Sequence, residues 1–67
     1  MPTRNLPTVV KRLRKQRKLS QAALGRKVGV TEAYISMIES GARPNPSLPT
    51  LQKLARALGV SVAELLE

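Results

Sequence analysis

The sequence predicts an all-α fold, a compact bundle of five helices, from three observations. Apolar residues recur at intervals of three and four along most of the chain, which places them on one face of each predicted helix. The alternation of apolar and polar residues that half-buried strands require is missing. Serine, threonine, proline and glycine stand where the periodic segments begin and end. We expect residues 1–67 to form a single domain.

The first predicted helix runs from Pro7 to Lys18, with the proline in its first turn. The basic run KRLRKQRK at residues 11–18 is interpreted mainly as a solvated face that adds long-range attraction for a polyanion. The residues expected to face the core are Leu6, Val10 and Leu13, flanked by Val9.

Residues 20–41 predict two short helices joined by a tight turn at Gly29, an arrangement typical of a helix-turn-helix. The first runs from about Gln21 to Val28 and is capped by Ser20. The second runs from about Thr31 to Ser40, is capped by Thr31 and ends at Gly41. An inward-facing seam is expected from Leu24, Val28, Val30, Ile35 and Ile38.

Gly25 lies in the middle of the second predicted helix, where a glycine costs about 1 kcal/mol relative to alanine. A small residue is useful there if two helices approach each other closely. The glycine therefore indicates a close contact at this point.

The proline-rich segment 42–49 is predicted to be a loop. A fourth helix follows from Ser47 or Leu48 to Leu58 and ends at Gly59. Ser61 caps a short fifth helix that ends in Leu65 and Leu66. The inward residues of the fourth helix are expected to be Leu51, Leu54, Ala55 and Leu58.

The composition favours a polyanionic partner and argues against several other functions. Twelve Lys and Arg residues against four acids give a formal charge of +8, which suits nucleic acid. Cysteine and histidine are absent, which removes disulfides and the commonest general base and metal ligand, so no enzyme activity, metal or cofactor is expected. No apolar run is long enough for a membrane span, and the first residues lack the apolar region of a secretory signal, so we expect a cytoplasmic protein.

The pattern resembles the Cro/phage-repressor type of helix-turn-helix domain, the XRE-like family of bacterial and phage DNA-binding regulators. The resemblance extends from about Leu6 to Glu67 and implies the five-helix bundle of phage-repressor DNA-binding domains, with the second and third helices as the helix-turn-helix. The residues that carry it include Leu19-Ser20-Gln21, Leu24, Val28-Gly29-Val30-Thr31, Tyr34-Ile35-Ser36, Ile38-Glu39, Gly41, Pro46-Ser47-Leu48, Thr50-Leu51, Leu54-Ala55, Ala57-Leu58-Gly59-Val60-Ser61 and Glu64-Leu65-Leu66.

In this motif the outer face of the third helix enters the major groove of double-stranded DNA. The resemblance further implies that Gln21 donates to a phosphate and that Arg43 contacts a phosphate or the groove edge. Tyr34 either places its hydroxyl on a phosphate or covers the core. The predicted DNA-binding residues are Gln21, Thr31, Glu32, Ala33, Tyr34, Ser36, Met37, Ser40 and Arg43.

The DNA sequence that is read does not follow from these side chains. The predicted third helix lacks the arginine or glutamine that makes strong bidentate contacts with bases. Glu32 either accepts from a cytosine amino group or repels phosphates, and Ala33 and Met37 suit thymine methyl groups. For Glu32 and Met37 the alternative is a tolerated surface residue.

A structural ion pair is expected between Arg14 and Glu39. Arg14 lies four residues after Val10, beside the core stripe, and Glu39 lies four after Ile35, on the inward side of its helix. A carboxylate buried there without a partner would cost several kcal/mol. In the family that the chain resembles, an arginine and a glutamate at these two positions pair.

The resulting hypothesis is a sequence-specific transcriptional regulator of double-stranded DNA, a repressor that binds a palindromic operator as a homodimer, with no small-molecule ligand implied. Val62, Leu65 and Leu66 exceed what a short surface helix needs, so part of this apolar surface is available for a two-fold interface. Two alternatives remain open: an antitoxin-type or other protein-interaction module with the same fold, and a non-specific basic protein that binds RNA or DNA.

Overall fold

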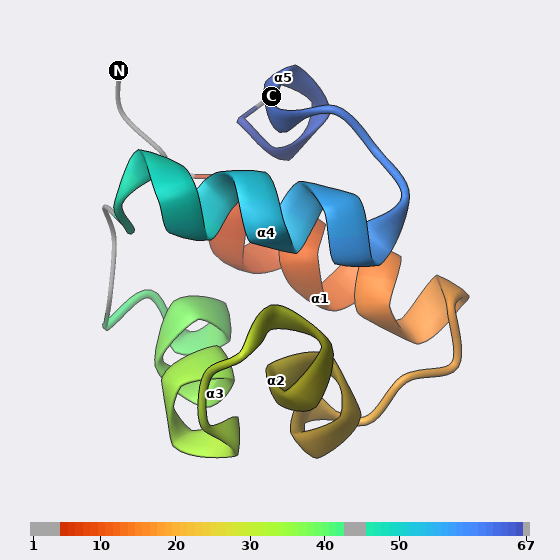
Figure 1. Cartoon of the computed structure of the whole chain (residues 1–67), viewed down its shortest axis with the longest axis vertical. Coiled ribbons are helices and arrows are strands. Elements are labelled where there is room, and N and C mark those ends of the chain that lie inside the picture. The colour runs from red at the N-terminus through yellow and green to blue at the C-terminus, as the bar shows by residue number, and fades with distance from the viewer. Residues whose placement is uncertain (1–4, 43–45, 67) are drawn as a thin grey trace.

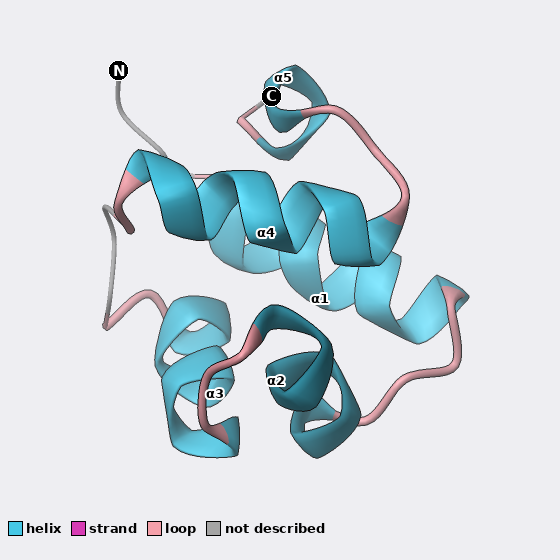
Figure 2. Ribbon diagram, in the orientation of Figure 1, coloured by secondary structure: helices cyan, strands magenta, loops and turns pink. Residues whose placement is uncertain are grey.

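The computed structural model describes residues 5–42 and 46–66, and five α-helices account for most of them. They are α1 (Leu6–Gln16), α2 (Gln21–Val28), α3 (Glu32–Ser40), α4 (Leu48–Leu58) and α5 (Val62–Leu65). Over these described ranges there is no strand, which Figure 2 shows as helices joined only by loops. The predicted all-α fold class is therefore confirmed. None of the helices in this part of the chain has the length and apolar character needed to cross a bilayer.

The helices are arranged so that α3 is held by two neighbours. In Figure 1, α2 and α3 lie together at the lower end of the molecule, α4 crosses the middle, and α5 lies at the upper end. α3 packs against both α2 and α1, while α2 also contacts α4. α5 closes the opposite end by packing on α4 and α1. The α2–α3 pair is thus presented at one end of a scaffold built from the other helices.

The core is aliphatic and draws on every helix. Val9 is buried and belongs to this core, whereas the sequence placed it on the flank. Leu13 and Val30, expected to face inward, are partly buried and pack against the core. The buried hydrophobic residues that form this core are Leu6, Val9, Val10, Leu24, Val28, Ile35, Ile38, Leu51, Leu54, Ala55, Leu58 and Leu65.

Side-chain caps begin four of the five helices. Ser20 and Thr31 each accept a hydrogen bond, 3.0 Å long, from a backbone N–H in the first turn of α2 and α3. Ser47 caps α4 in the same way. Ser61 and Glu64 form a reciprocal capping box on α5, which the sequence analysis overlooked although its spacing is visible. Because Thr31 is the cap, α3 begins one residue later than predicted.

The first helix departs from the predicted boundaries, since it begins at Leu6 and ends at Gln16 rather than at Lys18. Lys18 has a φ of 58°, in the left-handed region that ends a helix. The Leu19 N–H donates to the Arg14 carbonyl at 3.1 Å, and the Lys18 N–H donates to the Lys15 carbonyl at 3.0 Å. These two bonds form a Schellman motif without the usual glycine.

Replacing Lys18 by glycine should therefore stabilise the protein by about 1 kcal/mol, because a side chain in the left-handed region costs about that much. The midpoint of urea unfolding should rise. As a matched control, Lys15→Gly should lower the midpoint, since Lys15 lies inside the right-handed last turn of α1. A loss of stability in Lys18→Gly would contradict the assigned left-handed strain.

Candidate DNA-binding surface

The turn between α2 and α3 is closed around Gly25. Gly29 adopts a left-handed φ of 86°, and the N–H groups of Gly29 and Val30 both donate to the Gly25 carbonyl at 2.8 Å. A Cβ on Gly25 would lie 2.8 Å from the Val30 carbonyl oxygen and 3.2 Å from backbone atoms of Thr31. Gly25 therefore permits a close contact, as expected, but the partner is the turn backbone at Val30 and Thr31. This contact places the start of α3 against α2.

The outer face of α3 is open to solvent along its length. Ile35 and Ile38 are fully buried, so the residues on the opposite side of the helix point outward. Met37 is 40% exposed, so its side chain adds an apolar group to this face. The exposed residues of this face are Glu32, Ala33, Ser36, Met37 and Ser40. All five were predicted to face DNA.

The other predicted contact residues have different surroundings. Tyr34 is partly buried and packs against the core, so its ring covers apolar side chains. The exposed Thr31 uses its side chain to cap α3. Ser40 donates to the Met37 carbonyl at 3.1 Å. Arg43 lies outside the described residues.

Arg14 and Glu39 form an ion pair that fixes α3 on α1. Arg14 Nε donates to Glu39 Oε2 at 2.6 Å, and Arg14 Nη2 donates to Oε1 at 3.1 Å. The side chains are only 11% and 4% exposed. Such a bidentate pair constrains direction as well as distance. It also offsets the unfavourable position of Glu39 near the negative end of the α3 dipole.

The Arg14 guanidinium has a second role in the turn after α1. Its Nη1 donates to the Leu19 carbonyl at 2.7 Å, so one side chain links α1, the α1–α2 connection and α3. The hydrogen bond to Glu39 raises the pKa of Arg14 above its ordinary value, although burial opposes this shift. An arginine is charged even at its ordinary pKa, so this shift reinforces the ion pair with Glu39.

Gln21 joins this network from α2, a contact that the sequence analysis missed. Its Nε2 donates to Glu39 Oε1 at 3.1 Å. An amide nitrogen carries two N–H donors, so one remains for another acceptor. Glu39 thus receives hydrogen bonds from α1 and α2 at once, and the orientation of α3 is determined from both sides.

The cations that could meet phosphates do not lie on α3, whose sequence EAYISMIES has two glutamates and no lysine or arginine. One described group of cations beside α3 is on α1, where Lys11, Arg12 and Lys15 are exposed. These three side chains and Glu39 line a groove of about 360 Å³. The positive field at this end of the molecule is therefore supplied by residues flanking α3.

Two helices joined by a tight glycine turn, with an open outer face on the second, define a helix-turn-helix protein. Residues 10–65 match the helix-turn-helix family, so this chain belongs to that family, of the Cro/phage-repressor type.

Relatives in the family include regulators from Bacillus and its phages. The chain is 43% identical over 56 residues to the immunity repressor protein of Bacillus phage phi105, an alignment that covers 84% of this chain and 38% of the repressor. A crystal structure of SinR, described as a master regulator for biofilm formation, in complex with DNA superposes with a TM-score of 0.88 at 37% identity. That superposition covers 92% of this chain and 98% of the SinR chain. The chain spans only 38% of the phi105 repressor and 52% of the Bacillus subtilis SinR sequence.

The same fold also occurs as part of an enzyme. Hydroxypropylphosphonic acid epoxidase from S. wedmorenis superposes with a TM-score of 0.89 at 27% identity, over 98% of this chain and 35% of the enzyme chain. About two thirds of the enzyme chain therefore has no counterpart in the superposition.

Proposed function

We propose that this protein is a sequence-specific regulator of transcription that binds double-stranded DNA and acts as a repressor in the cytoplasm. The observation that carries the proposal is the open outer face of α3, held in one orientation by the partly buried network of Arg14, Glu39 and Gln21. The phi105 immunity repressor and the DNA-bound SinR domain support the same assignment.

In the proposed complex, α3 lies in the major groove with the residues of its first turns, Glu32, Ala33 and Ser36, nearest the base edges. The second N–H of Gln21 and the free backbone amides at the start of α2 donate to a phosphate. Thr31, Tyr34, Ser40 and Arg43 remain proposed contacts at the edges of this surface. Met37 supplies an apolar contact for a thymine methyl group.

We propose further that two copies bind a palindromic operator. One small module offers a limited interface, and half-sites one helical turn apart, about 34–36 Å, would double it. Leu65 is fully buried in the single chain, so the apolar surface left for a two-fold contact comes from the partly exposed Val62 and Leu66. If sedimentation at micromolar concentration with operator DNA detects only monomers, the proposed dimer is contradicted.

The function is tested by selecting bound duplexes from a random DNA pool at near-physiological salt. Enrichment of a palindromic motif is expected, with affinity falling about a hundredfold between about 50 and 200 mM salt if about four phosphates are contacted. Binding without any enriched motif would favour a non-specific basic protein. Failure to bind duplex DNA at all would favour a protein-interaction module such as an antitoxin.

Ser36→Glu should weaken binding to the selected duplex about 30-fold or more, because it places a negative charge in the groove and removes a small side chain that fits there. The matched control is Gln52→Glu, the same charge change at an exposed residue of α4. Fluorescence anisotropy of a labelled duplex measures both. Equal losses in the two variants would mean that charge alone, and not the α3 surface, determines binding.

We also propose that the protein is not an enzyme. The sequence has no histidine or cysteine, and only four carboxylates, one of which is engaged with Arg14 and Gln21. The likeness to the epoxidase is explained by a shared helix-turn-helix portion, since it covers about a third of that chain.

A further inference from the structure

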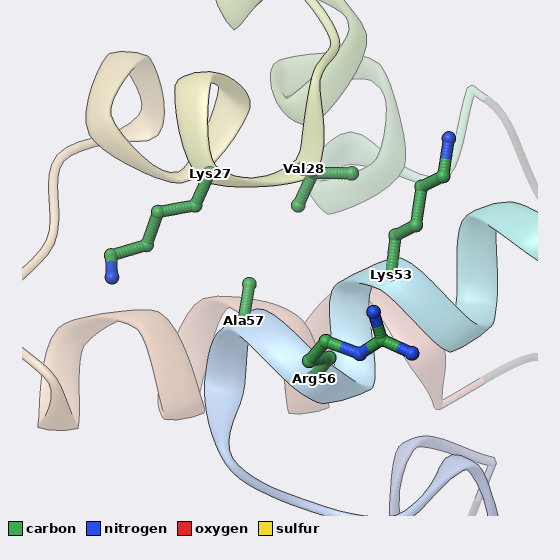
Figure 3. A pocket seen from close by; sticks show the side chains of 5 residues that line it. All are labelled: Lys27, Val28, Lys53, Arg56 and Ala57. Carbon is green, nitrogen blue, oxygen red and sulfur yellow. The ribbon is translucent and has the colours of Figure 1, made fainter.

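A hollow of about 460 Å³ lies between the C-terminal turn of α2 and the outer side of α4. Figure 3 shows Val28 and Ala57 facing the space between the two helices, with three long cationic side chains around it. The residues that line the hollow are Lys27, Val28, Lys53, Arg56 and Ala57. None of them belongs to the proposed DNA-contacting set.

The hollow carries positive charge that the protein itself does not neutralise. Within residues 5–42 and 46–66 the recorded ion pair joins Arg14 and Glu39, and no carboxylate faces Lys27, Lys53 or Arg56. Lys27 and Arg56 lie in the last turns of α2 and α4, where cations complement the helix dipole. Lys53 lies in the middle of α4 and has no such explanation. The three cations border one hollow with their charged ends spread to different sides of it (Figure 3), and capping explains only two of them.

The floor of the hollow distinguishes between two kinds of anionic partner. Ala57 presents a methyl group between the cations, and Val28, a core residue that is 4% exposed, adds only the edge of its side chain. A phosphate backbone offers nothing apolar to cover them, whereas a polypeptide can place an aliphatic side chain there and carboxylates on the cations around it. Exclusion of water by the aliphatic contact would strengthen the flanking ion pairs.

The position of the hollow leaves the α3 surface free. It adjoins Val28 at the C-terminal end of α2, while Gln21 begins that helix, and the seven-residue step between them spans about 10 Å along the helix axis. A ligand in the hollow therefore need not displace Gln21 from a phosphate.

We propose that this hollow is a docking site for an acidic segment of a partner polypeptide, in which an aliphatic residue flanked by aspartate or glutamate seats on Ala57 at the edge of Val28. The carboxylates of the segment pair with Lys27, Lys53 and Arg56. This interaction is independent of the proposed DNA binding and can coexist with it.

The probe is a short synthetic peptide in which a leucine is flanked on both sides by glutamates and aspartates. Titration into the ¹⁵N-labelled protein should shift the amide resonances of the five lining residues selectively. A control peptide with serine in place of the leucine should bind at least about tenfold more weakly. A second control peptide, with lysines in place of the acids, should not bind.

Two charge-reversed variants decide whether the site is specific. Lys53→Glu/Arg56→Glu should weaken peptide binding about tenfold, while Lys11→Glu/Arg12→Glu, which lowers the formal charge of +8 by the same amount on α1, should leave it within about twofold. Circular dichroism checks that both variants are folded. Equal losses in the two variants, or shifts spread over α1, would overturn the proposal.

Binding of the selected duplex separates this inference from the proposed function. Lys53→Glu/Arg56→Glu should bind that duplex within about tenfold of the unmodified protein. A loss of duplex binding far beyond this would identify the hollow as a phosphate contact and overturn the docking site, while the proposed function would stand. Peptide binding by a protein that binds no duplex would leave the docking site intact and remove the proposed function.

Discussion

Arg14→Met should lower the free energy of unfolding by about 3 kcal/mol, the largest loss expected from any single side chain outside the aliphatic core. The substitution leaves the Glu39 carboxylate, 4% exposed, with only the Gln21 amide as a partner. Removing one member of a buried ion pair typically costs 3–5 kcal/mol because the other charge stays buried. For a domain of this size that corresponds to a fall in Tm of about 15 °C. Urea unfolding at low temperature measures the change.

A double-mutant cycle tests whether the loss belongs to the pair. Glu39→Leu alone should cost less, because Arg14 keeps the Leu19 carbonyl and is partly exposed. The double variant Arg14→Met/Glu39→Leu should be more stable than Arg14→Met, giving a coupling of about 2 kcal/mol. Lys15→Met, an exposed neighbour on α1, is the control and should change stability by no more than about 0.5 kcal/mol. Additive single effects would show that the two side chains act independently.

Gly25→Leu should destabilise the protein by about 3 kcal/mol, the second large effect. Even the first atom of a side chain at this position would lie 2.8 Å from the Val30 carbonyl oxygen, and a leucine would force the turn away from α2. Since that turn starts α3, duplex binding should fall with stability. Thermal unfolding and duplex anisotropy on the same samples measure both losses.

Gly25→Ala tests how tightly the turn is held. Helix propensity favours alanine over glycine by about 1 kcal/mol, but the obstacle is backbone and cannot rotate away. We expect a net loss of about 1 kcal/mol. Ala23→Gly, in the same helix, measures the difference in stability that helix propensity alone produces between alanine and glycine. If Gly25→Ala gains as much stability as Ala23→Gly loses, the turn shifts at little cost. The close contact would then not explain the glycine.

Much of the fold could be predicted because its signals are local. The core faces of the helices follow from apolar spacing, and the starts of α2, α4 and α5 follow from Ser20, Ser47 and Ser61, whose oxygens meet amides only three residues away. The outer face of α3 could be predicted for the same reason, since burial of Ile35 and Ile38 determines which side is exposed.

The surroundings of the candidate site were less predictable, because they depend on residues far apart in the chain. The sequence marked Arg14 and Glu39 as misplaced charges, and resemblance to a family supplied the pairing. It did not reveal that Gln21, eighteen positions from Glu39, donates to the same carboxylate. Nor did it reveal the hollow, whose cations come from α2 and α4.

The amino-acid sequence by itself determined the number, type and order of the helices, the caps of α2, α3 and α5 and most of the buried faces, since spacing and capping act within one or two turns. Only the tertiary structure decided that Lys18 ends α1 in a left-handed conformation, that Val9 joins the core, and that backbone closes over Gly25. Each of these depends on how whole helices pack, because an unfavourable local conformation or an unusually close contact persists only where the packing of its neighbours stabilises it.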